Sequence, residues 1–303
     1  MRPGYKKIAV MTGASSFTGY WFCKSLIEDG YKVTCFFTQT KKNYSALKKE
    51  RINLLYKYKK NFIPIFNAKI GSEKFLKKIL RIKNFIFIHH GAYTLDYNSN
   101  KFDLLRAIND NNNNIKLMFE IFKKNSVNKL IYSSTIFQGE KKNNPENLYG
   151  LSKDITEQIF KYICEINKIK FKKFIIANPF GPFEEKRFLH YVLNSWKSKK
   201  TVEVKRPNDV VDYVQVQYLA NQFVKFIKTN QASFDLSQFS NTNLSFIKKI
   251  RRMIIKKNFL ECKIKYNNNK CEFNRINSTK IKINKSIEKK YWSEYFTYYD
   301  IKS

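Results

Sequence analysis

Tyr149 and Lys153 are the residues of this sequence whose types and spacing best suit a chemical reaction. They stand four positions apart at the start of residues 149–165, a segment with the periodicity of an amphipathic helix. Residues i and i+4 share one helix face, so the lysine ammonium lies beside the phenol. A positive charge there lowers the pKa of the phenol, which can then exchange a proton with a substrate hydroxyl. Because the chain has 19 tyrosines and is rich in lysine, a solvated helix face is the alternative.

A glycine-containing turn near the N-terminus has the composition of a dinucleotide site. The apolar segment 8–11 leads into Thr12-Gly13-Ala14-Ser15-Ser16-Phe17-Thr18-Gly19 and then into a helical segment, 19–28. Gly13 permits a tight turn, and Gly19 permits close packing of helix on sheet. Backbone N–H groups at the helix start, aided by the helix dipole, receive a pyrophosphate. Ser16 replaces the middle glycine of the pattern, so its side chain either crowds the phosphate or donates a hydrogen bond to it. A capping turn without a ligand is the alternative.

The end of the second expected strand, residues 31–37, bears on the choice of cofactor. NAD-specific sites place an Asp or Glu there for the ribose 2′-hydroxyl, and this sequence has Phe37. Thr38 and Lys41 follow, and a lysine suits a 2′-phosphate. The sequence therefore favours NADP slightly over NAD, although Lys41 and Lys42 are equally consistent with ordinary solvated lysines.

The elements that must position these residues alternate along the first 180 residues. Expected strands are 8–11, 31–37, 62–66, 84–89, 129–133 and 171–177, and expected helices are 19–28, 44–58, 72–80, 102–124 and 149–165. Continuous apolar strands between amphipathic helices indicate a parallel sheet covered on both faces. The expected fold is therefore α/β, a Rossmann-type doubly wound parallel sheet in a dinucleotide-binding domain of residues 1–180.

The pattern loosens in residues 181–303, where we expect a smaller C-terminal α/β substrate-binding lobe. Its expected helices are 188–197, 216–228 and 244–256, with short strands at 201–204 and 233–236. No linker rich in proline, glycine or serine separates the two parts, so the sequence leaves open a return of the chain from one to the other.

Charge and cysteine content narrow the class of protein. The net charge is +34, but only 9 of the 58 basic residues are arginine, and the lysines are spread over every segment. No nucleic-acid-binding motif is visible, so the charge indicates attraction of anionic substrates such as nucleotide diphosphates rather than DNA or RNA. Five widely spaced cysteines without a C-x-x-C motif are typical of a reduced, cytoplasmic protein. We expect no metal site, no signal peptide and no membrane insertion, because the apolar runs are far shorter than about 20 residues.

Several segments together resemble the extended short-chain dehydrogenase/reductases, the NAD-dependent epimerase/dehydratase family acting on nucleotide sugars. The segments that carry the resemblance are, in order, Thr12-Gly13-x-x-Ser16-Phe17-x-Gly19, His89-His90-Gly91-Ala92, Asn109, residues 130–139, Tyr149-x-x-x-Lys153, Asn178-Pro179-Phe180-Gly181-Pro182 and residues 212–216. Their collinear order gives the resemblance its weight. The sequence departs from the family pattern at Ser16 in place of glycine and at Val211 in place of arginine.

The resemblance implies a role for each matching residue. Ser134 takes the place of the catalytic Ser or Thr that hydrogen-bonds the substrate oxygen, with Ser133 as the local alternative. Tyr149 is the implied acid/base, and Lys153 holds the nicotinamide ribose and lowers the pKa of Tyr149. The other implied cofactor-binding residues are Gly13, Ser16, Phe17, Gly19, Thr38, Lys41, His90, Gly91, Ala92 and Asn109. Asn178 is expected to bind the substrate, and Arg275 is a candidate for its diphosphate because an Arg fork matches phosphate.

The resemblance also limits the reaction. Family dehydratases carry an Asp-Glu pair directly after the catalytic Ser or Thr, where this sequence has Thr135 and Ile136, so dehydration is not expected. A 4-epimerase and a 4-ketoreductase remain open, as does a non-catalytic nucleotide-binding protein that keeps the fold. A homodimer formed through the helical segments 102–124 and 149–165 is implied by the resemblance.

Overall fold

The computed structural model describes residues 7–139, 145–258, 261–267, 270–271, 274–275, 277 and 279–301. The chain forms two compact units. Met1–Ile176 and Ala220–Phe234 make up the first unit, and Ala177–Leu219 and Asp235–Ser303 make up the second. The segment Ala220–Phe234 therefore returns to the first unit after the chain has entered the second.

The first unit contains six parallel strands in the doubly wound arrangement. These are β1 (Ile8–Thr12), β2 (Lys32–Phe36), β3 (Phe62–Ile65), β4 (Phe85–His89), β5 (Lys129–Thr135) and β6 (Lys170–Ile176). Their order is β3-β2-β1-β4-β5-β6, and the sheet continues through β10 (Ser233–Ser237) and β14 (Thr279–Lys280). The register aligns Val10 with Thr34 on one side and with Phe87 on the other. The predicted fold class is confirmed, and the carboxyl ends of β1, β4 and β5 meet at one edge.

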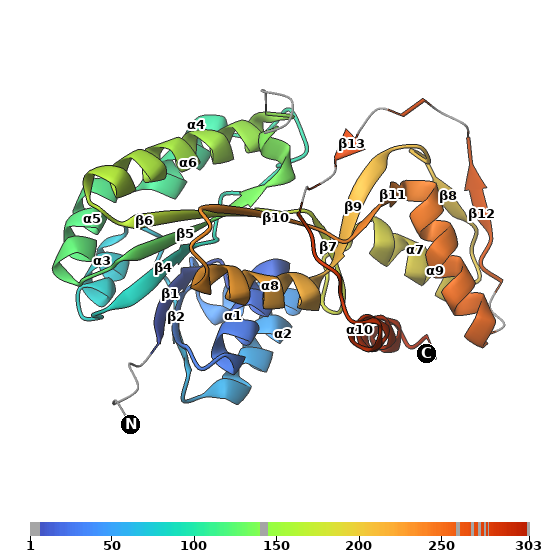
Figure 1. The fold of residues 1–303 in the computed structure, drawn as a ribbon, viewed down its shortest axis with the longest axis horizontal. Coiled ribbons are helices and arrows are strands. Elements are labelled where there is room, and N and C mark those ends of the chain that lie inside the picture. The colour runs from blue at the N-terminus through green and yellow to red at the C-terminus, as the bar shows by residue number, and fades with distance from the viewer. Residues whose placement is uncertain are drawn as a thin grey trace. The chain divides into compact units, whose positions relative to one another are not determined.

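Helices cover both faces of this sheet. They are α1 (Phe17–Glu28), α2 (Ala46–Leu55), α3 (Glu73–Ile79), α4 (Leu104–Asn112), α5 (Ile115–Lys124), α6 (Leu148–Ile166) and α8 (Val216–Lys228). Figure 1 shows α4, α5 and α6 on one face and α1 and α2 on the other. On the face of α1, Phe22 stacks on Phe223 of α8 at 4.2 Å between ring centroids. Fully buried apolar side chains on both faces fix the helices that position the candidate site.

The expected single helix 102–124 is wrong. The structure divides it into α4 and α5, with Asn113 and Asn114 between them. Asn114 adopts a left-handed conformation with φ 49° and ψ 34°, and its side chain donates to the Gly71 carbonyl at 2.8 Å. Asparagine tolerates this region because its short side chain bonds locally. The run of four asparagines, 111–114, thus marks a break.

The second unit is built around the strand β9 (Val210–Gln215). It pairs in parallel with β7 (Asn178–Phe180) and β13 (Asn274–Arg275), and antiparallel with β11 (Phe239–Thr242). A separate pair consists of β8 (Val202–Val204) and β12 (Ile264–Tyr266). The helices are α7 (Phe188–Lys197), α9 (Asn243–Asn258) and α10 (Lys285–Tyr298).

Large aromatic side chains form the core of the second unit. Phe180, Trp196, Phe246, Trp292 and Tyr295 are each at most 3% exposed. Their burial explains why the short strands of this unit, which the sequence pattern did not predict at β7, β9 and β11, pack as one body.

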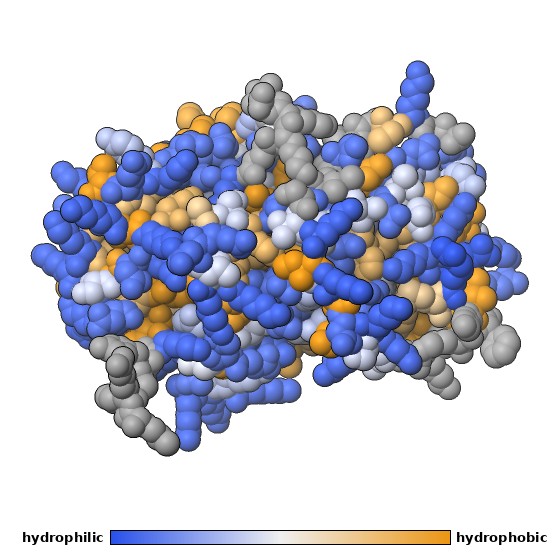
Figure 2. Space-filling view, viewed as in Figure 1, coloured by the Kyte–Doolittle hydropathy of each residue, from blue (hydrophilic) through white to orange (hydrophobic). Residues whose placement is uncertain are grey.

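Figure 2 shows hydrophilic side chains over most of the face drawn there, with small apolar areas between them. Within the described ranges, no helix is both long enough and apolar enough to span a membrane.

Candidate functional site

The glycine turn after β1 lies against the end of β4, backbone to backbone. Gly13 has φ +78°, and a Cβ added to it would come within 2.6 Å of the Gly91 nitrogen. A Cβ on Gly19 would come within 2.1 Å of the Gly13 carbonyl oxygen. Thr12 Oγ1 accepts from the Gly91 and His90 amides at 2.9 and 3.2 Å. The turn can therefore form only without side chains at these glycines. Such a compact turn, followed by a helix with no acidic residue in its first turn, fits the phosphates of a dinucleotide.

Ser16 is the N-cap of α1, and its hydroxyl faces the turn. Its Oγ accepts from the Gly19 amide at 3.1 Å and donates to the Gly13 carbonyl at 2.9 Å. The backbone of Ser16 has φ −72°, which any L-residue adopts without strain, so glycine is not required here for its conformation. Phe17, the first residue of α1, is buried.

His90 connects this turn to β5. Its Nε2 lies 3.1 Å from Ser16 Oγ and 3.1 Å from Thr18 Oγ1, and its Nδ1 lies 2.9 Å from Ser133 Oγ. Burial, together with the charge of Lys153, lowers the pKa of His90 to about 3, so the imidazole is neutral at physiological pH. The motif alone implied that His90 belongs to the cofactor site, but these side-chain contacts could not be derived from it.

At the end of β2, an apolar side chain is buried where an acidic residue was looked for. Phe37 is 1% exposed and stacks on Phe66 at 4.9 Å between ring centroids. Thr38 is exposed, with Oγ1 3.3 Å from the hydroxyl of Tyr44. The Lys41 ammonium lies 4.5 Å from the centroid of the Tyr56 ring. Two of the predicted cofactor contacts, Thr38 and Lys41, therefore have partners within the chain.

Arg51 of α2 is a charged neighbour of the turn that the sequence did not indicate. Its side chain is fully buried, and Nη1 donates to the Ser15 carbonyl at 3.1 Å. Nothing in its sequence position marks it, because α2 contains several basic residues and only the fold distinguishes this one.

Tyr149 lies at the beginning of α6, among aromatic rings. The N-cap Asn147 accepts from the Gly150 amide at 2.8 Å. The Tyr149 ring is 5.5 Å from that of Tyr97, 5.9 Å from that of Phe102 and 6.2 Å from that of Phe137, centroid to centroid. A Cβ on Gly150 would come within 2.0 Å of the Phe137 carbonyl oxygen, so the first turn of α6 lies directly on the segment after β5.

Lys153 is one helical turn further on and is 2% exposed. Its Nζ lies 4.1 Å from the centroid of the Tyr132 ring, and the Tyr132 hydroxyl donates to the Lys153 carbonyl at 2.7 Å. Burial lowers the pKa of Lys153 to about 7; Glu157 opposes this shift, and Lys173 adds to it. A lysine whose pKa is lowered to near 7 is found in functional sites more often than on solvated helix faces.

Ser134, near the end of β5, is 2% exposed and belongs to a buried chain of polar groups. Its hydroxyl donates to Gln138 Oε1. Gln138 Nε2 in turn donates to Glu157 Oε2 at 2.7 Å, and the same oxygen pairs with Lys173 Nζ at 2.7 Å. The sequence did not predict Gln138, Glu157 or Lys173, because β5, α6 and β6 bring them together from distant positions.

The structure brings Asn111, rather than Asn109, to the end of β4. Asn109 is exposed on α4, whereas Asn111 is 3% exposed. The Oδ1 of Asn111 accepts from the Tyr93 amide at 3.2 Å, and its carbonyl lies 3.3 Å from His89 Nε2. The repeated asparagines of this segment made the two positions indistinguishable in the sequence.

The predicted substrate residues lie in the second unit. Asn178 begins β7 and pairs in register with Tyr213 of β9. Arg275 lies in β13, where its backbone pairs with Val211, and its side chain is outside the described residues. Their roles as substrate ligands stay predictions.

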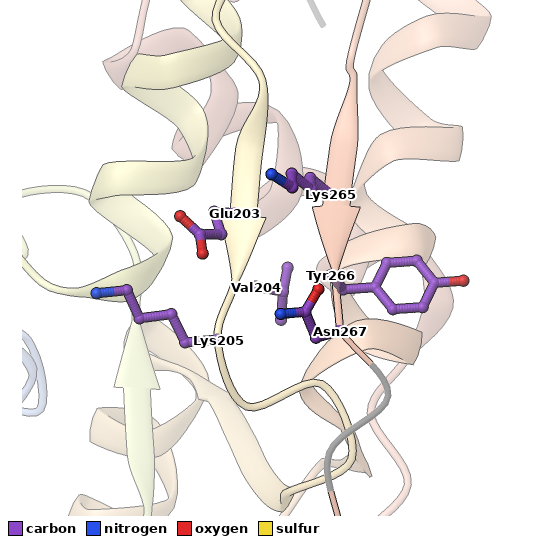
Figure 3. A pocket seen from close by; sticks show the side chains of 6 residues that line it. All are labelled: Glu203, Val204, Lys205, Lys265, Tyr266 and Asn267. Carbon is purple, nitrogen blue, oxygen red and sulfur yellow. The ribbon is translucent and has the colours of Figure 1, made fainter.

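A small hollow of about 140 Å³ lies elsewhere in the second unit, beside β8 and β12. Figure 3 shows its lining residues, which are Glu203, Val204, Lys205, Lys265, Tyr266 and Asn267. None of them is a predicted site residue. Across the described part of the chain, no group of three or more His, Cys, Asp or Glu side chains is arranged to hold a metal ion.

Comparison with known proteins identifies a family model that matches this chain. The model of the family described as "NAD dependent epimerase/dehydratase family" matches residues 9–236. A search of curated protein sequences finds no match.

Solved structures share the fold over nearly the full chain. The UDP-N-acetylglucosamine 4-epimerase of Methanobrevibacter ruminantium M1, in complex with UDP-N-acetylmuramic acid, has a TM-score of 0.75 at 18% identity, covering 98% of this chain and 99% of the other. The UDP-glucuronic acid 4-epimerase of Bacillus cereus, with UDP-glucuronic acid and NAD, has a TM-score of 0.70 at 15% identity, covering 97% and 99%. The dTDP-glucose 4,6-dehydratase DesIV of Streptomyces venezuelae, with NAD and TYD, has a TM-score of 0.66 at 11% identity, covering 94% and 91%. At identities this low, the likeness shows the fold alone.

Proposed function

The chain belongs to the NAD-dependent epimerase/dehydratase family, and on that premise we propose that it is an NAD-dependent 4-epimerase of a nucleotide-diphosphate sugar. The observation that supports this proposal most directly is Lys153. It is 2% exposed, has a pKa lowered to about 7, and lies one helical turn after Tyr149 on α6. A lysine at this position supports a tyrosine acid/base, because its positive charge beside the phenol would favour the phenolate.

Each residue has a definite part in the proposed reaction. When bound, NAD would supply the acceptor and donor of the hydride that leaves and rejoins the sugar carbon. Tyr149 takes the proton of the hydroxyl on that carbon as the ketone forms, and gives it back when the hydride returns. Lys153, when protonated, favours the phenolate form of Tyr149. The Ser134 hydroxyl, which donates to Gln138 in the structure, would turn to donate to the sugar oxygen, so that it hydrogen-bonds that oxygen both as hydroxyl and as ketone. Hydride and proton both return, so the net reaction is an isomerisation.

The cofactor in this proposal is NAD. The preference for NADP came from the missing acid after β2 and from Lys41. Because the Lys41 ammonium lies over the Tyr56 ring, it is held by a partner of the chain itself. The related B. cereus epimerase structure contains NAD. The glycine turn with Gly13, Gly19 and Gly91 would hold its pyrophosphate, and Lys153 its nicotinamide ribose.

Dehydration is disfavoured by the residues after Ser134. Thr135 caps the short 3-10 helix Ile136–Gln138 through its hydroxyl, and Ile136 begins that helix. Neither side chain can transfer a proton in the way a carboxylate can. The likeness to a dehydratase structure is a likeness of fold.

A homodimer is part of the proposal. Helices α4, α5 and α6 expose large apolar side chains: Leu105 is 72% exposed, Tyr162 66%, Ile166 62% and Leu117 46%. Burying such side chains against a second copy is favourable by about 25 cal/mol per Å² of apolar surface. We propose that Asn178 and Arg275 bind the nucleotide-diphosphate part of the substrate, and that the protein acts in the cytoplasm.

Cofactor retention combined with a substrate panel tests the proposed function. Purified protein is denatured and the released nicotinamide is measured, and intact protein is incubated with UDP- and dTDP-sugars with no cofactor, NADH or NADPH. An epimerase yields retained NAD and a 4-epimer without added cofactor. NADPH oxidation that depends on a ketosugar would instead indicate a ketoreductase. Binding of a nucleotide sugar without turnover under any condition would indicate the non-catalytic alternative.

A further inference from the structure

The dinucleotide turn of this chain carries a side chain where the family pattern has none. Ser16 occupies the middle glycine position, and its hydroxyl has three partners within 3.1 Å: the Gly13 carbonyl, the Gly19 amide and His90 Nε2. A hydroxyl has one proton to donate and two lone pairs to accept with. Donation to the Gly13 carbonyl uses the proton, so the contacts with the Gly19 amide and with His90 must both be accepted by Ser16 Oγ.

This assignment fixes the tautomer of His90. If Ser16 Oγ accepts from the imidazole, the proton of the ring lies on Nε2. Nδ1 is then an acceptor, and it receives the hydroxyl proton of Ser133 at 2.9 Å. Thr18 Oγ1, also 3.1 Å from Nε2, shares the same donated proton. The lowered pKa of His90 agrees with a neutral ring that donates from one nitrogen and accepts at the other.

We propose that His90 is a positioning residue that holds the Ser16 hydroxyl within the helix cap, and so keeps the pyrophosphate path clear in a turn that lacks the middle glycine. The proposal rests on NAD binding as proposed above and explains how this chain tolerates serine at Ser16. Without the Nε2–H donor, the Ser16 hydroxyl keeps only the Gly13 carbonyl and the Gly19 amide as partners, and the side chain can then turn toward the Phe17 and Thr18 amides, which a phosphate would otherwise occupy.

Two polar substitutions of His90 distinguish the hydrogen bond made by Nε2 from the one made by Nδ1. The amide of His90→Gln ends near the level of Nε2 and can still donate to Ser16. The amide of His90→Asn ends near the level of Nδ1, so it can bond Ser133 but cannot reach Ser16. Each is made alone and together with Ser16→Gly, NAD retained through purification is removed, and the dissociation constant for NAD is then measured by calorimetry. Thermal unfolding without cofactor is recorded for every variant to control for folding.

The expected result is a coupling between the two positions. His90→Asn should weaken NAD binding by about tenfold, and His90→Gln by less than about threefold. In the Ser16→Gly background, His90→Asn should have less than about a threefold effect, because no side chain remains to be held. Amide exchange at Gly19 in cofactor-free protein should be faster in His90→Asn than in His90→Gln.

An equal loss of affinity from His90→Asn in both backgrounds, or no loss in either, would overturn the role assigned to His90 while leaving the proposed function in place. Failure of the unmodified protein to bind NAD or NADP at all would overturn the proposed function and this inference together.

Discussion

Lys153 is held in surroundings that oppose its own charge. Its side chain is 2% exposed, and its pKa is lowered to about 7 from an ordinary value of 10.5. The folded protein therefore binds this proton less tightly than the unfolded chain does. Burial of the charged amine therefore lowers the free energy of unfolding. This loss is complete below pH 7 and disappears as the pH rises toward 10.5, because the unfolded chain binds more protons than the folded protein in that range.

Lys153→Met should accordingly stabilise the protein while removing activity. We expect a gain of about 1–3 kcal/mol in the free energy of unfolding at pH 6, since a methionine fills a similar volume without a charge. The gain should shrink between pH 7 and pH 10. Denaturant unfolding of both proteins at several pH values measures it. A gain that is constant with pH, or a loss at pH 6, would contradict a buried, near-neutral lysine.

Gln138 joins Ser134 to Glu157, and its loss should affect both stability and rate. Gln138→Met leaves the buried Ser134 hydroxyl without its acceptor and removes one donor from Glu157, which keeps Lys173, and this costs about 1–3 kcal/mol of stability. The rate should fall as well, because Ser134 is no longer held in one rotamer. The matched control is Gln231→Met at an exposed position, which should change stability by less than about 0.5 kcal/mol. Equal effects of the two substitutions would show that the hydrogen bonds from Ser134 through Gln138 to Glu157 contribute nothing to stability or rate.

The site residues were predictable to different degrees, for a physical reason. Tyr149 and Lys153 are neighbours in one helix, so their relation is encoded by local spacing. Gln138, Glu157 and Lys173 meet across a strand, a helix and a second strand, so only the tertiary fold reveals the contact. Arg51 was missed for the same reason.

At the scale of elements, α8 depends on two lysines of the sheet. Lys172 Nζ donates to the Phe226 and Thr229 carbonyls at 2.7 Å each, and Lys129 Nζ donates to the Ile227 carbonyl at 2.7 Å. These carbonyls belong to the end of the helix, where intrahelical partners are missing. The two lysines therefore fix the segment that returns to the first unit.

Lys172→Met should lower the free energy of unfolding by about 1–3 kcal/mol, because two helix-terminal carbonyls lose a charged donor. Lys170→Met, two residues earlier on the same strand but exposed, is the control and should be nearly neutral. Chemical denaturation of the two variants compares them directly. If Lys170→Met proved as damaging as Lys172→Met, general loss of lysine rather than capping would be the cause.

The elements of the first unit were predictable because apolar strands alternate there with amphipathic helices. The errors lie where backbone conformation departs from that pattern, as at Asn114 between α4 and α5. Helices α7 and α8 match their expected residues. In the second unit, however, β7, β9 and β11 are short and pair across long separations in sequence. The helix α10 was not predicted, because the basic and aromatic C-terminal segment shows little apolar periodicity.

At the scale of the whole molecule, the net charge of +34 should influence substrate capture. A nucleotide-diphosphate sugar is anionic, so the protein's field raises its encounter rate. We expect kcat/KM to fall several-fold as ionic strength rises from about 0.01 M to about 1 M, where the Debye length shortens from about 30 to about 3 Å. Steady-state kinetics in a salt series measures this, and a flat profile would show that the lysines play no part in capture.

The central claim is tested most directly by Tyr149→Phe, with Tyr162→Phe on the same helix as its control. Phenylalanine keeps the ring contacts of Tyr149 and removes only the hydroxyl. Tyr162, 66% exposed in the single chain and on the proposed dimer face, likewise keeps its apolar ring as phenylalanine. The measurement is the initial rate of 4-epimer formation on the best nucleotide sugar, together with the NAD content of each protein. We predict that Tyr149→Phe retains NAD but loses about 10²- to 10⁴-fold in rate, while Tyr162→Phe is unchanged. A Tyr149→Phe protein that forms the epimer at the full rate would contradict the account.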